Sequence, residues 1–169
     1  LLYIRGSREV LNDNCFAIVG TRALSEYGKR SAPHIALGVA RAGFTIASGL
    51  AMGIDTLAHK AAFDAGAKTI AVLGTGIDDE TIFPVPNLGL ARKIIELDGA
   101  VISEYAVGTH GTKFSFPQRN RIISGLSRGV LVVEADEQSG AMITARFAAE
   151  QGRDVFAIPG NIFAKTSQG

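Results

Sequence analysis

Short apolar runs recur along the chain, and they lack the alternation of apolar and polar residues that marks a half-buried strand. Each run is rich in Val, Ile, Leu or Ala, which is the composition of strands that are buried on both faces. The runs are Phe16–Val19, Phe44–Ala47, Thr69–Leu73, Ala100–Ile102, Val130–Val133 and Asp154–Ile158. We therefore expect these runs to form the buried strands of one sheet.

Segments with a helical spacing of apolar residues separate most of these runs. They are Ser25–Arg41, Gly53–Ala65, Pro86–Leu97 and Ala141–Gln151. Ser25 is a typical N-cap, Pro33 should start or kink the first helix, and a glycine closely follows each of the others, as at helix ends. Strands that alternate with helices predict an α/β fold, a doubly wound, mostly parallel sheet with helices on both faces.

The length and composition fit one globular domain over residues 1–169, with 47% hydrophobic and 20% charged residues. No apolar run approaches the roughly 18 residues of a membrane helix, and the start lacks a signal-peptide pattern, so we expect no membrane association. Cys15 is the only cysteine and should be a buried small hydrophobe, which fits a reducing, cytoplasmic location. Because no initiator methionine is present, we expect a fragment of a longer protein.

The net charge is +1, with 17 basic and 16 acidic side chains. A protein that coats duplex DNA without sequence preference is usually strongly basic, so this balance argues against that class. Any nucleic-acid site must therefore be a local cluster on a near-neutral surface.

Glycine and hydroxyl residues follow most of the predicted strands. Ligands of open parallel sheets bind beyond the carboxyl ends of the strands, where Gly20-Thr21-Arg22 and Ser48-Gly49 lie. Glycine lets the backbone approach a phosphate, and Arg22 adds a cation, although the glycines could equally make tight turns only. In Gly74-Thr75-Gly76-Ile77-Asp78-Asp79 the third glycine of a dinucleotide motif is absent, which disfavours a standard NAD or ATP enzyme.

A second cluster, Lys113–Arg121, interleaves lysine and arginine with two phenylalanines and an asparagine. Cations hold phosphates, a phenylalanine stacks on a base, and asparagine bonds a base edge, so the cluster is a candidate DNA site. The alternative is a solvated helix start, and we expect Phe114 or Phe116 to lie in the core.

Acid–base and metal patterns are weak. Asp55 and His59 stand four residues apart on a predicted helix, but a capping aspartate and a packed histidine explain them more simply than a metal pair. Asp78-Asp79-Glu80 is expected to be a solvated turn. We predict no catalytic residue, no metal site, no cofactor and no enzymatic activity.

Taken together, several segments resemble the DNA-processing protein A family (DprA, also called Smf). They are Val19–Arg22, Ser48–Asp55, Phe116–Ser127, Val132–Ala135, Ser139–Ala145 and Gly152–Gly160. The resemblance implies an extended Rossmann-like domain that binds single-stranded DNA and forms a homodimer. It also implies a role in loading the RecA recombinase on incoming DNA during natural transformation.

The resemblance also assigns residues to the DNA site. Arg22 and Lys113 would contact phosphates, and Phe116 would stack on a base. The other expected DNA-binding residues are Gly20, Thr21, Ser48, Gly49, Arg119, Asn120 and Arg121. Residues 106–113 lack the proline-rich stretch that the family usually has before its Phe-Pro pair. Ile162 and Phe163, which follow the last predicted strand, are candidates for the dimer interface.

The alternative from another class is a nucleotide-processing enzyme of the lysine-decarboxylase-like phosphoribohydrolase group. That group carries Pro-Gly-Gly-x-Gly-Thr-x-x-Glu after a late strand, whereas residues 134–140 here read Glu-Ala-Asp-Glu-Gln-Ser-Gly. A pure oligomer scaffold is a third possibility, but it would leave Arg22 and the Lys113–Arg121 cluster without a function.

Overall fold

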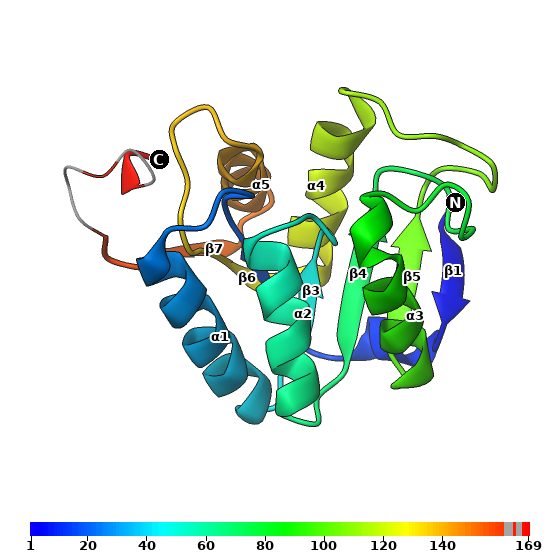
Figure 1. Ribbon diagram of the computed structural model, residues 1–169, viewed down its shortest axis with the longest axis horizontal. Coiled ribbons are helices and arrows are strands. Elements are labelled where there is room, and N and C mark those ends of the chain that lie inside the picture. The colour runs from blue at the N-terminus through cyan, green and yellow to red at the C-terminus, as the bar shows by residue number, and fades with distance from the viewer. Residues whose placement is uncertain (161–163, 165–166) are drawn as a thin grey trace.

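The computed structural model describes residues 1–160, 164 and 167–169, and it is a three-layer α/β structure. Helices α1, α2 and α3 cover one face of a single sheet, and α4 and α5 cover the other (Figure 1). The strands are β1 (Tyr3–Gly6), β2 (Cys15–Val19), β3 (Thr45–Ser48), β4 (Thr69–Leu73), β5 (Ala100–Ser103), β6 (Ser127–Val132) and β7 (Asp154–Ala157). The helices are α1 (Glu26–Arg41), α2 (Ile54–Asp64), α3 (Leu88–Glu96), α4 (Ser115–Leu126) and α5 (Gly140–Glu150), with short 3₁₀ turns at Glu9–Asn12 and Val85–Asn87.

The strand order is β1-β5-β4-β3-β2-β6-β7. All neighbouring pairs are parallel except β1 with β5. The six predicted strands correspond to β2–β7, which confirms the predicted doubly wound, mostly parallel α/β fold.

The strand order reverses at β2. The chain first adds β3, β4 and β5 on one side of β2 and then returns to place β6 and β7 on the other. Ala17 of β2 pairs with Ala47 of β3 and with Val130 of β6. In an open sheet such a reversal leaves a crevice at the carboxyl ends of the central strands, which is where ligands bind.

The two edge strands differ from expectation. The sequence pattern did not reveal β1, because its four residues gain their partner nearly 100 positions later, where Tyr3 pairs with Ser103. All four residues of β7 are exposed, so the prediction of a strand buried on both faces is wrong there. Its apolar sequence gives no sign that, among the described strands, it lies at the edge of the sheet beside β6.

The helices begin largely where their caps predict. Ser25 caps α1 by accepting a hydrogen bond from the Gly28 amide at 3.0 Å. Helix α1 continues without a break through Pro33, which neither starts nor interrupts it. Helix α4 was not predicted as an element, because the sequence of its first turns reads as a polar and aromatic cluster.

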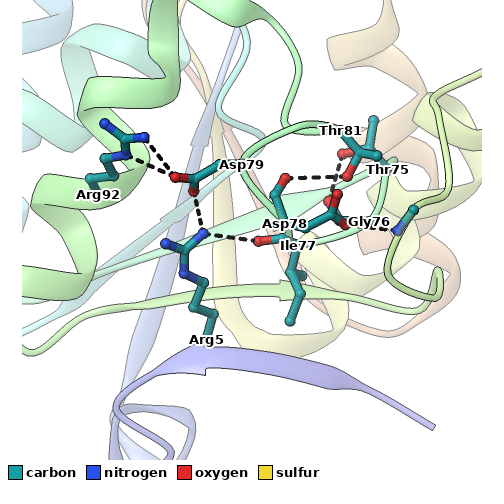
Figure 2. Close-up of polar contacts among 9 residues, drawn as sticks. Arg5, Thr75, Gly76, Ile77, Asp78, Asp79, Thr81 and Arg92 are labelled. Carbon is teal, nitrogen blue, oxygen red and sulfur yellow. Dashed lines mark hydrogen bonds and ion pairs between the residues drawn. The ribbon is translucent and has the colours of Figure 1, made fainter.

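The acidic turn Asp78–Glu80 is accessible to solvent, as its sequence suggests, but it is also held by ion pairs that the sequence did not predict. Asp79 forms ion pairs with Arg5 of β1 and Arg92 of α3, and Asp78 accepts a hydrogen bond from the Gly108 amide at 2.9 Å (Figure 2). The hydrogen bond from Arg5, followed by that from Arg92, lowers the pKa of Asp79. The turn therefore connects β1, α3 and the loop after β5.

In the part of the chain that the structure describes, no helix combines the length and apolarity needed to cross a membrane.

Candidate nucleic-acid interface

A cavity of about 320 Å³ lies at the carboxyl ends of the central strands. Its wall comes from the end of β2 and the turn after it, the loop after β3, the beginning of α2, the first three turns of α4 and the beginning of α5. The lining residues are Val19, Gly20, Thr21, Arg22, Ala23, Ala51, Asp55, Phe116, Pro117, Arg119, Asn120, Ile123, Ser139, Gly140, Ala141 and Thr144. The cavity thus occupies the crevice that the strand order predicts.

The beginning of α5 presents a partial positive charge to this cavity. Ser139 caps the helix by accepting a hydrogen bond from the Met142 amide. The amides of Gly140 and Ala141 have no hydrogen-bond acceptor among the described residues. A Cβ built on Gly140 would meet no described atom within 4 Å. Free amides and the helix dipole therefore face open space, as they do in anion-binding sites.

Arg22 adds a full positive charge to the same cavity. Its side chain is exposed and makes no ion pair or hydrogen bond with any described residue. The two carboxylates that could have paired with it have other partners: Glu104 pairs with Arg121, and Glu134 accepts a hydrogen bond from the Ser25 hydroxyl. The guanidinium of Arg22 is therefore available to an anionic ligand.

Arg119, by contrast, is a buried structural cation, with 5% of its surface exposed. Its Nη1 donates to the carbonyl oxygens of Gly49 and Val72, and its Nε donates to the Asn120 side chain at 3.1 Å. Burial lowers the pKa of Arg119 to about 10, while the Asp55 carboxylate acts in the opposite direction. Arg119 therefore connects α4 to the ends of β3 and β4.

Asn120 connects the hydrogen bonds of Arg119 to helix α5. Its Nδ2 donates to the Gly140 carbonyl oxygen at 3.0 Å, and its Oδ1 accepts from Arg119. Since Gly140 is the first residue of α5, Asn120 fixes the beginning of that helix relative to α4. The amide oxygen and the amide nitrogen of Asn120 both bond to the protein, so this residue holds the cavity wall together and does not present its amide to a ligand.

His59 is packed in the core as expected, but Asp55 is not the helix cap that its sequence suggested, because Gly53 is the N-cap of α2 and makes no side-chain cap. Asp55 accepts hydrogen bonds from the amides of Gly49 at 3.0 Å and Ala51 at 3.3 Å, and burial raises its pKa. His59 is fully buried, with its Nδ1 2.7 Å from the Thr69 hydroxyl, and burial lowers its pKa to about 3. Histidine is therefore neutral here at physiological pH. The described residues hold no group of three metal-ligating side chains.

Neither candidate phenylalanine lies in the core, contrary to expectation. Phe114 is 71% exposed, with the Lys113 ammonium 5.1 Å from its ring centre. Phe116 is half-buried because two glycines make room for its ring. A Cβ on Gly74 would come within 2.8 Å of Phe116 Cδ1, and one on Gly111 within 2.5 Å of Cζ. The ring of Phe116 is thus held in place at the edge of the cavity.

At the glycines after β2 and β3, the protein's own packing leaves no room for a side chain. A Cβ on Gly20 would lie 2.6 Å from Ile54 Cγ1, and one on Gly49 would lie 2.8 Å from Arg119 Nη2. Protein atoms already fill both spaces. These glycines permit close packing of the loops beneath the cavity, and the open space lies at Gly140 instead.

The structure brings six of the ten predicted site residues to the cavity: Gly20, Thr21, Arg22, Phe116, Arg119 and Asn120. The other four, Ser48, Gly49, Lys113 and Arg121, are not among its lining residues. The hydroxyl of Ser48 is buried and donates to the Ile18 carbonyl oxygen at 2.6 Å. Arg121 turns to Glu104. Ile162 and Phe163, the predicted dimer residues, lie outside the described residues.

The cavity is also lined by residues at the beginning of α5 that are not among the predicted DNA-binding residues, namely Ser139, Gly140, Ala141 and Thr144. A usable signal was present, because a serine and a glycine followed by a helical run mark a capped helix at the carboxyl end of a strand.

A family model described as DNA recombination-mediator protein A matches residues 1–169. The chain belongs to this family. Protein Smf of Escherichia coli (strain K12), 48% identical over 168 residues, matches 99% of this chain and 44% of its own length. DNA processing protein DprA of Streptococcus pneumoniae (strain ATCC BAA-255 / R6), 48% identical over 169 residues, matches 100% of this chain and 58% of its own length. The chain spans about half the length of these curated relatives.

Solved structures of the recombination-mediator family share the fold. DprA from Streptococcus pneumoniae superposes with a TM-score of 0.88 at 45% identity, covering 98% of this chain and 57% of that one. DprA from Helicobacter pylori, reported for its single-stranded DNA binding mode, gives a TM-score of 0.89 at 31% identity and covers 99% and 75%. The Rossmann-like fold expected from the DprA/Smf resemblance is confirmed.

Proposed function

We propose that the chain binds single-stranded DNA in the cavity at the carboxyl edge of its sheet. One observation carries this proposal. The guanidinium of Arg22 and the amides of Gly140 and Ala141, which have no partner among the described residues, line the same cavity as the half-buried ring of Phe116. A phosphate fits the positive groups, and an unstacked base fits the aromatic ring.

The charge distribution favours a single strand over a duplex. The 17 basic side chains are nearly balanced by 16 acidic ones, which gives little net attraction for a row of phosphates, so affinity must also come from contacts with bases. A duplex keeps its bases stacked and paired, whereas a single strand can offer a base to a concave site of about 320 Å³.

The relatives support the same function. The Helicobacter pylori DprA reported for its single-stranded DNA binding mode aligns with 99% of this chain. For the whole protein we propose the family role in recombination, in which it helps to load the RecA recombinase on incoming DNA during natural transformation.

We further propose that the protein forms a homodimer through the β7 edge of the sheet. Val155 and Phe156 on this strand are 44% and 48% exposed. An open edge strand with apolar side chains is a surface that proteins tend to cover. Ile162 and Phe163, which follow β7 in the sequence, are expected to extend this interface.

We propose a binding function without catalysis. In the phosphoribohydrolase alternative, a glutamate near the late strand would have to act on a nucleotide. Here the carboxylate of Glu134 accepts hydrogen bonds from the hydroxyl and the amide of Ser25, next to the first turn of α1. Glu134 therefore has a structural role at the beginning of α1.

An equilibrium titration with single-stranded and double-stranded DNA of equal length tests the proposal. We expect the single strand to bind at least about tenfold more tightly at the same salt concentration, because only it offers unstacked bases. Equal or tighter binding of the duplex would contradict single-strand recognition. Release of free base from nucleoside monophosphates by the same preparation would favour the phosphoribohydrolase alternative.

A further inference from the structure

A second cavity, of about 210 Å³, lies beside the first and shares Phe116 with it. The residues that line it are Glu80, Thr81, Ile82, Phe83, Val85, His110, Gly111 and Phe116. Most of them belong to the loop after β4, so this cavity is also at the carboxyl edge of the sheet. It continues the proposed DNA site in the direction of β4 and β5.

The second cavity exposes an aromatic ring that the fold leaves partly uncovered. Phe83 is 51% exposed, and its ring centre lies 5.6 Å from that of Phe116 with an interplanar angle of 46°. At this tilt and spacing a base cannot enter between the two rings. The exposed surface of Phe83 is nevertheless open to a base that stacks from outside.

The loop holds Phe83 firmly from both sides. Before it, the amide of Ile82 donates to the Asp78 carbonyl oxygen at 3.1 Å, and the Ile82 side chain is buried. After it, the amide of Asn87 donates to the Pro84 carbonyl oxygen at 2.9 Å, and the Asn87 side chain donates to the Leu50 carbonyl oxygen at 2.8 Å. An aromatic ring between two anchored segments loses little further freedom when a ligand binds.

The chemistry of this second cavity suits a base and not a phosphate. Glu80 contributes a carboxylate to the wall, and a carboxylate repels a phosphate. Phe83, Phe116 and Val85 supply apolar surface, and His110 supplies a ring that can bond a base edge. The two cavities therefore differ in character, since Arg22 and the beginning of α5 make the first one suitable for an anion.

We propose that Phe83 is a second base-stacking residue, which holds the nucleotide adjacent to the one at Phe116. This inference rests on the proposed binding of single-stranded DNA. It commits the strand to a path from Arg22, after β2, past Phe116 to the loop after β4. Phe83 adds affinity through stacking and makes no contact with a phosphate.

The test compares Phe83→Leu and Phe83→Tyr with the wild-type chain in titrations with oligothymidylate over a range of salt concentrations. Phe83→Leu keeps apolar bulk but removes the ring, so we expect about tenfold weaker binding, within the range of one base–aromatic stack. Phe83→Tyr should bind as the wild type does. Because stacking involves no charge, the slope of log affinity against log salt should not change.

Leu97→Ala is a matched control, because it also removes an exposed apolar side chain. Leu97 lies just after α3 and shortly before β5 begins, at the end of the sheet opposite the two cavities. It should leave binding unchanged. Phe83→Leu binding within twofold of wild type, while Arg22→Ala is impaired, would overturn the role of Phe83 and leave the proposed function intact. The role of Phe83 would also be overturned if Phe83→Leu lowered the melting temperature and Phe83→Tyr lowered it as well. Failure of the wild-type chain to bind the oligonucleotide would overturn both proposals.

Discussion

Replacing Arg119 by methionine is expected to lower the free energy of unfolding by about 3–5 kcal/mol, the cost of removing one partner from a buried ionic network. Methionine retains an apolar side chain but cannot donate hydrogen bonds. The carbonyl oxygens of Gly49 and Val72 would lose their guanidinium donor, and the buried carboxylate of Asp55 would lose a nearby positive charge. Equilibrium unfolding in urea at neutral pH measures the loss.

Arg121→Met is the matched control for this substitution. It lies two residues further along α4, and its side chain is 41% exposed in its ion pair with Glu104. Exposed ion pairs contribute about 0–1 kcal/mol, so Arg121→Met should be nearly neutral. Equal losses for the two variants, or a loss below about 1 kcal/mol for Arg119→Met, would contradict the structural role of Arg119.

Gly140→Asp is expected to weaken binding of single-stranded DNA by about a hundredfold without destabilising the protein. The side chain would project from the first residue of α5 into the open cavity, where the proposed phosphate binds. Two negative charges 4 Å apart repel by about 4 kcal/mol at an effective dielectric constant of 20, and salt screening at this exposed position reduces the repulsion to the roughly 3 kcal/mol of a hundredfold loss. An acidic residue in the first turn of a helix is itself favourable by about 0.3–1 kcal/mol, so the melting temperature should hold or rise.

Gly140→Ala separates this charge effect from the loss of glycine. No described atom lies within 4 Å of the added Cβ, so alanine should cause only a small change in affinity. Titrations of both variants with oligothymidylate, together with melting curves, measure the two effects. DNA binding by Gly140→Asp at the wild-type level would place the phosphate away from the beginning of α5.

The sheet was predictable from sequence because strands buried on both faces carry a continuous apolar signal. That signal is strong in the runs that became β2, β4 and β6, and it also placed the candidate site at the carboxyl ends of the strands. It failed for β7, whose sequence is as apolar as a central strand although it lies at the edge. A strand such as β1, which pairs with a distant segment, leaves almost no local signal.

The site was predictable only in part, because the direction of a side chain depends on elements that the sequence left undefined. Arg119 and Arg121 look equivalent in sequence, yet two helical positions differ by about 200° around the axis. One arginine therefore enters the core while the other reaches Glu104 at the surface. Likewise Gly20 and Gly140 each follow a strand, but only the structure shows which space is filled and which is open.

The salt dependence of DNA binding by Arg22→Ala tests most directly whether this cavity holds the strand. A phosphate contact at Arg22 predicts weaker binding, a log–log salt slope that is smaller by about 0.7, and an unchanged melting temperature. Arg41→Ala, which removes an equal charge from the last turn of α1, should leave the slope unchanged. An unchanged slope for Arg22→Ala, with or without a loss of stability, would contradict binding of a phosphate at Arg22.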